Sequence, residues 1–299
     1  MASKQKVVAV FSLLNAATVW GLIWYPYRAL AQQGVPGELA TFLTYSIALV
    51  FGLLLFGPVW RELRTAGWWG VALTLCAGWT NLGYVLAMLG GEVMRVLLLF
   101  YLAPLWTVLL SNLMLGERLN RYGYATIALS LGGAFVMLWR PEHGMPMPQN
   151  LAEWIGLSAG LGFALTNVLV RRVWQLSINF KSASVWFGTA LLTVLPLLYH
   201  GNIAAQVGVI APDGWWLMTA IALVLCATSF SVQYGLTSLP ANQSILLFMF
   251  ELVVAAVSSY FLAGEEMGVR EVAGAVLIVT ASLFSGKLHN KADKLGSGV

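Results

Sequence analysis

Charged residues are scarce in this chain of 299 residues. Asp, Glu, Lys and Arg make up 9% of it, hydrophobic residues make up 59%, and the mean hydropathy is +0.80. A soluble domain carries about 25% charged residues, so this chain could not cover its own surface in water. The composition excludes an ordinary soluble enzyme, a disordered protein and a nucleic-acid-binding domain, although the formal net charge is +4.

Cysteine and histidine are also rare. The two cysteines, Cys76 and Cys226, each lie inside an apolar run, and the three histidines lie in predicted loops or in the C-terminal tail. These residues give no disulfide framework and no metal cluster, so we expect neither a metal nor another cofactor. The sequence contains no Walker motif, so ATP is not expected to drive the protein directly.

Long apolar runs account for most of the chain. A helix needs about 20 apolar residues to cross roughly 30 Å of hydrocarbon. Ten candidate spans meet or approach that length: 7–31, 38–57, 68–89, 92–115, 122–139, 151–172, 182–199, 214–236, 243–263 and 272–286. The first run is longer than the apolar part of a signal peptide, so we expect it to remain as a membrane helix. The sequence therefore predicts an all-α integral membrane protein with ten transmembrane helices.

The basic residues predict the orientation in the membrane. With the N-terminus in the cytoplasm, the inner segments hold twelve Lys and Arg residues and the outer segments hold four. Cytoplasmic loops carry an excess of Lys and Arg. We therefore expect both termini in the cytoplasm.

A weak internal repeat relates the two halves of the chain. A shift of 148 residues superimposes the third to fifth spans on the eighth to tenth, and it places Gly116-Glu117 on Gly264-Glu265 and Leu98-Leu99-Phe100 on Leu246-Leu247-Phe248. Five spans per half mean that the halves enter the membrane in opposite directions, as in many secondary transporters. We expect residues 1–148 and 149–299 to form two inverted five-helix repeats, with a substrate site between them near the midplane.

Several short motifs share one order and spacing. Trp20-Gly21 lies in the first span, Pro104 in the fourth, and Gly-Glu follows the fourth and ninth spans. This pattern, from about Val7 to Gly286, resembles the drug/metabolite transporter (DMT) superfamily in its EamA-like ten-helix branch. The aromatic-rich interior is most similar to the bacterial aromatic amino-acid exporters, which implies a bacterial inner (plasma) membrane. The family often has a proline after the ninth-span glutamate; here Leu252 follows it, which puts a symmetric kink in doubt.

Glu251 is the only acidic residue near the centre of a predicted span. A carboxylate there costs about 2.5–3.5 kcal/mol on insertion scales, so it should face the bundle interior or a wet cavity. Two interpretations remain open. The carboxyl group holds a substrate ammonium group or a proton, or it is a structural acid bonded to a neighbouring helix.

Polar and aromatic residues near mid-span are further candidates for a cavity wall. Asn81 and Tyr84 share a helix face, and Pro104, one turn after Tyr101, frees a backbone carbonyl group. An aromatic wall with amide and hydroxyl groups would suit a ring-bearing amino acid. The substrate-binding candidates besides Glu251 are Trp20, Trp24, Trp79, Asn81, Tyr84, Tyr101, Thr166, Asn167, Trp186 and Tyr234. Ordinary helix packing is the alternative for each of them, and Arg95 either attracts a carboxylate or extends to the membrane surface.

Gly156 and Gly160 form a GxxxG pair, which lets membrane helices approach closely. Gly156-Leu157-Ser158-Ala159-Gly160 also matches the hydrolase motif G-x-S-x-G. That motif needs a strand-to-helix turn and a His partner, whereas here it lies within a predicted membrane helix. We therefore do not expect an enzyme.

The preferred hypothesis is a secondary transporter that exports amino acids, aromatic and other neutral ones, by alternating access through a central cavity. Its partners would be the amino acid and the lipid bilayer, with no nucleic acid, and it would be a monomer or a weak homodimer. Whether protons are coupled to export stays open. The alternative is efflux of organic cations or drugs, with Glu251 and the tryptophans as an aromatic cage. A structural membrane protein would leave the repeat and the buried acid unexplained.

Overall fold

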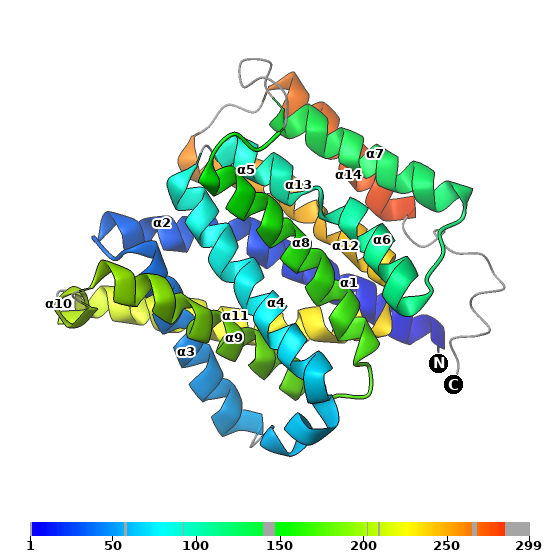
Figure 1. The fold of residues 1–299 in the computed structure, drawn as a ribbon. Helices are drawn as coiled ribbons and strands as arrows, with labels where there is room; N and C mark the ends of the chain where they lie inside the picture. The colour runs from blue at the N-terminus through cyan, green and yellow to red at the C-terminus, as the bar shows by residue number, and fades with distance from the viewer. Residues whose placement is uncertain are drawn as a thin grey trace.

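The computed structural model describes residues 2–56, 59–91, 93–139, 147–201, 203–208, 210–264 and 268–284, and every regular element in these ranges is a helix (Figure 1). The elements are α1 (Ala2–Leu22), α2 (Trp24–Gln32), α3 (Gly37–Phe56), η1 (Trp60–Glu62), α4 (Leu63–Gly90), α5 (Val93–Phe100), α6 (Ala103–Leu115), α7 (Arg121–Leu138), α8 (Leu151–Arg172), α9 (Ile178–His200), α10 (Ile203–Gly208), α11 (Pro212–Ser238), α12 (Ala241–Phe248), α13 (Phe250–Ala263) and α14 (Val269–Phe284).

Eight helical segments of the described chain are long and apolar enough to cross a membrane. They are α1 with α2, α3, α4, α5 with α6, α8, α9, α11, and α12 with α13. The two other predicted spans correspond to α7 and α14, which have 18 and 16 described residues and pack against each other. The chain is thus a multi-pass membrane protein, while ten spans remain a prediction.

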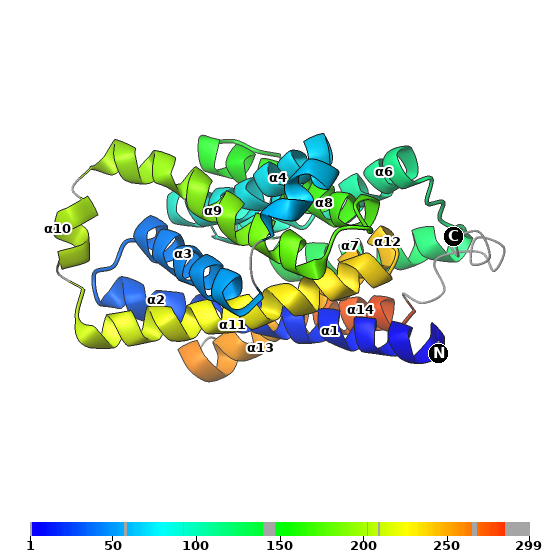
Figure 2. The same ribbon diagram turned by 90° about the horizontal axis from the view of Figure 1, so that it is seen from below.

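The helices form one elongated bundle with two distinguishable ends. We call the end at which α1 begins the N-terminal end, and the opposite end, where α10 lies, the α10 end (Figure 2). The chain turns from α11 into α12 near the N-terminal end, and α9 and α11 meet α10 at the other.

Proline interrupts two of the spans. Between α1 and α2 lies Ile23, three residues before Pro26, and between α5 and α6 lie Tyr101 and Leu102, just before Pro104. A proline has no N–H to bond the carbonyl group four residues earlier, and its ring clashes with that group. The carbonyl of Phe100 therefore loses its helical partner.

The span formed by α12 and α13 is interrupted without a proline. Met249 is the one residue between the two helices, with φ −61° and ψ −16°. The Ser282 hydroxyl on α14 donates to the Leu246 carbonyl at 3.2 Å, in place of the amide of Phe250. A side chain inserted in this way opens a helix. The α12–α13 span is therefore interrupted at Met249 although no proline follows Glu251, and a contact from α14 lies at this interruption.

Small residues allow α8 to pack directly on α5. A Cβ atom at Gly160 would lie 2.4 Å from the Phe100 carbonyl oxygen, and one at Gly156 would lie 3.1 Å from Val96 Cγ1. The close helix approach predicted from the GxxxG pair is confirmed. This face of α8 continues through Phe163 to Asn167, at a spacing of three and four residues.

Candidate functional site

Glu251 lies in the first turn of α13, directly after the break at Met249. Its side chain is half-buried. Tyr101, in the break between α5 and α6, makes a polar side-chain interaction with the Glu251 carboxyl group, and Tyr84 on α4 interacts with it electrostatically. Three of the predicted site residues are therefore brought together, from three helices and beside two helix breaks.

Three phenylalanines form a layer next to Tyr84 and Tyr101. Phe163 on α8 lies between Phe100 and Phe248, with ring centroids 5.6 and 5.3 Å away. Phe100 also packs edge-on against Tyr84 at 5.2 Å and Tyr101 at 5.4 Å. We call Phe100, Phe163 and Phe248 the aromatic layer. The candidate list missed them, although the 148-residue repeat superimposes Phe100 on Phe248.

The break between α1 and α2 packs against α13 beside Glu251. A Cβ atom at Gly21 would lie 2.8 Å from the Glu251 carbonyl oxygen. The Trp24 indole N–H donates to Ser258 Oγ at 2.9 Å, and the Ser258 hydroxyl lies 3.1 Å from the Gly21 carbonyl oxygen, an acceptor near the break. Trp20 is half-buried and packs against a separate apolar cluster of α3, α9 and α11.

Trp79 and Asn81 on α4 have polar partners on neighbouring helices. The Trp79 indole N–H donates to Ser158 Oγ on α8 at 3.1 Å. Asn81 Oδ1 accepts a hydrogen bond from the Tyr45 hydroxyl on α3 at 2.7 Å. These contacts join neighbouring helices, as ordinary helix packing would, and ordinary packing was the alternative to a cavity role for both residues.

The remaining candidates have other partners. Trp186 on α9 is 1% exposed, and its indole N–H donates to Ser229 Oγ at 2.8 Å. Tyr234 is half-buried against an apolar cluster. Thr166 bonds the Gly162 carbonyl of its own helix at 2.8 Å. Asn167 is fully buried, and its Nδ2 donates to a backbone carbonyl group of α8.

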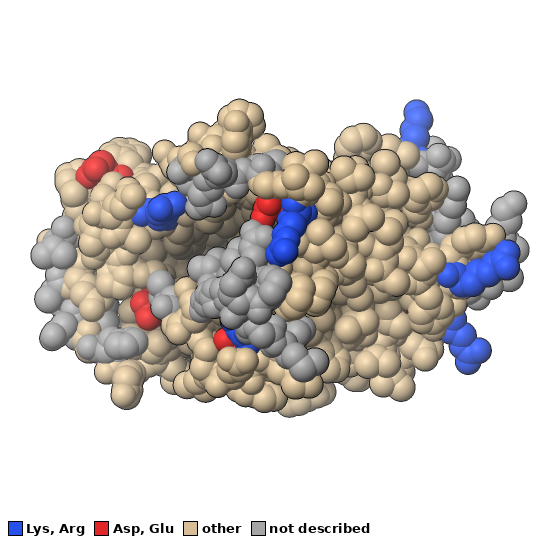
Figure 3. Space-filling view, turned by 90° about the horizontal axis from the view of Figure 1, so that it is seen from above, with Lys and Arg blue, Asp and Glu red and all other residues tan. Residues whose placement is uncertain are grey.

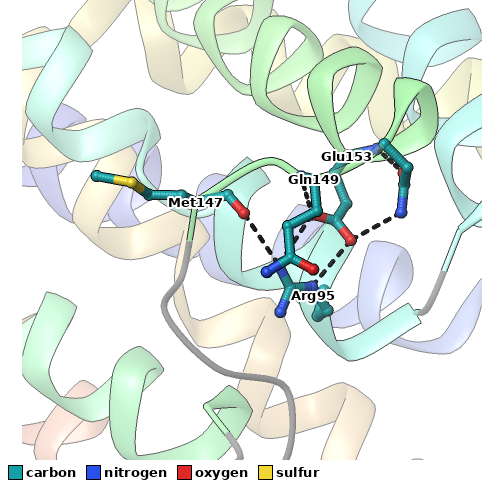
Figure 4. Close-up of polar contacts among 5 residues, drawn as sticks. Arg95, Met147, Gln149 and Glu153 are labelled. Carbon is teal, nitrogen blue, oxygen red and sulfur yellow. Dashed lines mark hydrogen bonds and ion pairs between the residues drawn. The ribbon is translucent and has the colours of Figure 1, made fainter.

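Arg95 is buried rather than extended to the surface, so of its two alternatives the extended one is wrong. Its Nε and Nη2 donate to the two carboxylate oxygens of Glu153 at 2.8 and 3.0 Å, and Nη2 also donates to the Met147 carbonyl at 2.9 Å (Figure 4). Glu153 in turn accepts from the Gln149 amide and from Asn150 Nδ2. Arg95 therefore binds a carboxylate of this chain and ties α5 to α8.

Glu117, in the turn after α6, caps the first turn of α12. Pro240 precedes α12 and offers no side-chain cap. The Glu117 carboxylate accepts from the Ala241 amide at 3.1 Å and from Asn242 Nδ2 at 3.4 Å, and it lies 4.0 Å from Arg171 Nε. Burial raises the pKa of the Glu117 carboxyl above its usual value, and the bond from the Ala241 amide partly offsets that rise. This contact joins the α6–α7 turn to the broken α12–α13 span.

A second carboxylate holds the capping residue of α9. Glu62, in η1, accepts hydrogen bonds from the amide and the hydroxyl of Ser177, the residue that caps α9, at 2.7 and 2.5 Å. Arg171 and Lys181 both bond Thr237 at the end of α11. Contacts between distant parts of the sequence therefore hold the N-terminal end together.

Seen from above the view of Figure 1, the surface of the molecule has a hollow. Figure 3 shows this hollow with acidic and basic side chains near it, on an otherwise mostly uncharged surface.

Comparison with known proteins gives consistent matches. The model of the EamA-like transporter family matches residues 7–139 and 150–286. An uncharacterized transporter of Archaeoglobus fulgidus is 24% identical over 208 residues, which cover 69% of this chain and 72% of that protein. A probable terminal-alkyne amino-acid exporter of Streptantibioticus cattleyicolor is 28% identical over 217 residues, 68% of this chain and 69% of that protein. A crystal structure superimposes with a TM-score of 0.74 at 19% identity, covering 93% of this chain and 96% of that chain, and so shares the fold.

Proposed function

Because the chain belongs to the EamA-like transporter family, we propose that it is a secondary transporter that exports amino acids, aromatic and other neutral ones, by alternating access. The family implies a small-molecule substrate and a lipid environment. The similarity to a probable amino-acid exporter supports the amino-acid substrate.

The proposed architecture is ten spans in two inverted repeats, residues 1–148 and 149–299. The breaks at Tyr101 and Met249 are 148 residues apart, the same offset that relates Phe100 to Phe248. Broken helices near the midplane are typical of binding sites in transporters built from such repeats. The distribution of Lys and Arg supports a cytoplasmic N-terminal end in a bacterial inner membrane.

The observation that carries the proposal is the carboxyl group of Glu251 beside two tyrosines and two helix breaks. In our proposal the Glu251 carboxylate binds the ammonium group of the substrate by charge-assisted hydrogen bonds. Tyr84, Tyr101 and Phe100, whose rings pack edge-on with one another, would contact the substrate side chain.

Counterflow in proteoliposomes tests this function. Wild-type protein should exchange radiolabelled phenylalanine and tryptophan, and Glu251→Gln should lower the exchange by at least about tenfold, the loss expected for a bond between two charged groups. Glu38→Gln, the same change near the start of α3, is the matched control and should exchange like the wild type. A pH gradient in a second series shows whether protons are coupled to transport.

Two results would contradict the proposal: exchange by Glu251→Gln at the wild-type rate, or wild-type protein that exchanges no amino acid. The aromatic side chains around a carboxylate also favour one alternative, efflux of an organic cation. Transport of a quaternary ammonium probe in place of the amino acids would establish that alternative.

A further inference from the structure

Six buried side-chain oxygen atoms and the Trp106 indole nitrogen have no hydrogen-bond partner in the described part of the chain. Three of the oxygens, Thr107 Oγ1, Asn167 Oδ1 and Asn242 Oδ1, lie on α6, α8 and α12. All three residues are 0% exposed. Buried polar atoms in proteins are nearly always paired, because an unpaired one loses its bonds to water without replacement. Three such atoms on helices that pack against one another therefore require an explanation.

Contacts of neighbouring residues connect the positions of the three side chains. Thr107 lies on the buried stripe of α6 that also contains Ser111, and the Ser111 hydroxyl accepts from Asn242 Nδ2 on α12 at 2.7 Å. Asn167 lies one turn beyond Phe163 on the α8 face that contacts Phe248 of α12. Helices α6, α8 and α12 pack pairwise on one another. We call Thr107, Asn167 and Asn242 the polar junction.

The junction is closed at both ends in this structure. The aromatic layer separates it from Glu251, because Phe248 lies between Asn242 and Glu251 along the chain and Phe163 lies one turn before Asn167. Toward the N-terminal end, Glu117 bonds the Ala241 amide and Asn242 Nδ2. Along α12 and α13, the polar junction and Glu251 therefore lie on opposite sides of the aromatic layer.

The chemistry of the unpaired atoms selects the ligand. The two amide oxygens are acceptors, and the hydroxyl oxygen of Thr107 can accept as well. An ammonium group carries three N–H donors, one for each of these atoms. A carboxylate has only acceptor atoms and cannot bond the two amide oxygens, so these oxygens favour the amino end of a substrate over its acid end.

We propose that the polar junction is a second binding station for the substrate ammonium group, closed here and opened toward the N-terminal end in the other conformation of the carrier. This proposal rests on the proposed amino-acid transport. The substrate passes from Glu251 to the junction when the aromatic layer parts and the contact of Glu117 with α12 releases.

Cysteine labelling tests the opening. Ser111→Cys, in a background with both native cysteines replaced, places a thiol beside Asn242 while keeping the three station residues. Ser184→Cys is the control, since Ser184 is also buried but bonds the Phe180 carbonyl on α9. A membrane-impermeant maleimide applied at the N-terminal end should label Ser111→Cys and leave Ser184→Cys unlabelled. Absence of labelling at Ser111→Cys overturns the proposal.

Protection by ligands tests the chemistry. Phenylalanine and phenethylamine, which both carry an ammonium group, should slow labelling of Ser111→Cys severalfold, and hydrocinnamate, which has none, should not. Equal protection by hydrocinnamate, or no protection by any of them, overturns the station. If the wild type also exchanges no amino acid, the proposed function itself fails; with exchange intact, the failure is confined to the station.

Two isosteric variants provide a second measurement. Thr107→Val removes an unpaired hydroxyl group, whereas Thr189→Val removes one that bonds the Val185 carbonyl at 2.8 Å, from an equally buried position. We expect Thr107→Val to raise the apparent melting temperature by roughly 2–4 °C and to slow export about tenfold. Thr189→Val should leave export unchanged. A Thr107→Val protein that is less stable and exports normally contradicts the proposal.

Discussion

Removal of one partner from the Arg95–Glu153 ion pair should be among the most destabilising single changes in this protein. The pair is bidentate, with Nε–Oε1 and Nη2–Oε2 distances of 2.8 and 3.0 Å, and the Arg95 and Glu153 residues are 8% and 2% exposed. Arg95→Met would leave a buried carboxylate without its cation, and Glu153→Gln would leave a buried guanidinium without its anion. Both changes roughly keep the volume of the side chain.

The expected magnitude follows from the burial. Breaking a buried pair by removing one partner costs about 3–5 kcal/mol, and the low exposure means that solvent screening reduces this little. The double variant Arg95→Met, Glu153→Gln removes both charges, and the side-chain carbonyl group that it introduces at position 153 can still accept from the Gln149 amide. We therefore expect the double variant to cost only about 1–2 kcal/mol, far less than the sum of the two single changes.

The assay is reversible unfolding of purified protein in mixed detergent micelles, followed for the wild type and the three variants as a double-mutant cycle. Coupling of several kcal/mol between Arg95 and Glu153 is the expected result. The reasoning is refuted if the two single changes add, or if either one costs less than about 1 kcal/mol.

Three further changes probe other contacts. The pKa of Glu117 is raised in the folded state. Just above the usual Glu pKa of about 4.3, the folded state therefore keeps a proton that the unfolded state has lost. The free energy of unfolding should fall as pH rises through the range between these two pKa values. Glu117→Gln should flatten that fall in unfolding curves recorded against pH, and an unchanged slope would contradict the assignment. Gly160→Val forces a Cβ atom to within 2.4 Å of the Phe100 carbonyl oxygen and should cost at least about 2 kcal/mol of unfolding free energy. Gly132→Ala, where the added Cβ meets nothing within 4 Å, is the control and should cost nothing. Ser282→Ala frees the Leu246 carbonyl to bond the Phe250 amide, so hydrogen exchange at that amide should slow roughly fivefold; unchanged exchange would show that the serine does not hold the helix open.

The sequence predicts the local features of this fold well. Hydrophobic length locates the spans, proline spacing explains the break before Pro104, and the spacing of Gly156 and Gly160 predicts the close approach of α8. Each of these depends on neighbouring residues and on the geometry of one helix. The rarity of an acid within a span also identified Glu251 before its surroundings were known.

Partners that are far apart in the sequence could not be predicted. Arg95 and Glu153 are 58 residues apart, and nothing in either segment indicates which carboxylate the arginine binds. Ser282 bonds the Leu246 carbonyl beside the Met249 break, and this contact exists only once α14 is packed against α12. Asn81 was a reasonable cavity candidate from its helix position alone, but the Tyr45 hydroxyl occupies its carbonyl oxygen.

The carboxylates of Glu62 and Glu117 have a consequence for how the protein is assembled. Both precede residue 149 in the chain, and each bonds the start of a helix that follows it: Glu62 holds Ser177, the N-cap residue of α9, and Glu117 bonds the Ala241 amide of α12. During synthesis from the N-terminus, Glu62 and Glu117 are therefore made before the first residues of α9 and α12, which they bond. A fragment that begins at residue 149 would keep the Ser177 cap of α9 but lose the contact with Glu62 that holds Ser177, and its α12 would start without a cap. The fragment that ends at residue 148 could supply both contacts in trans.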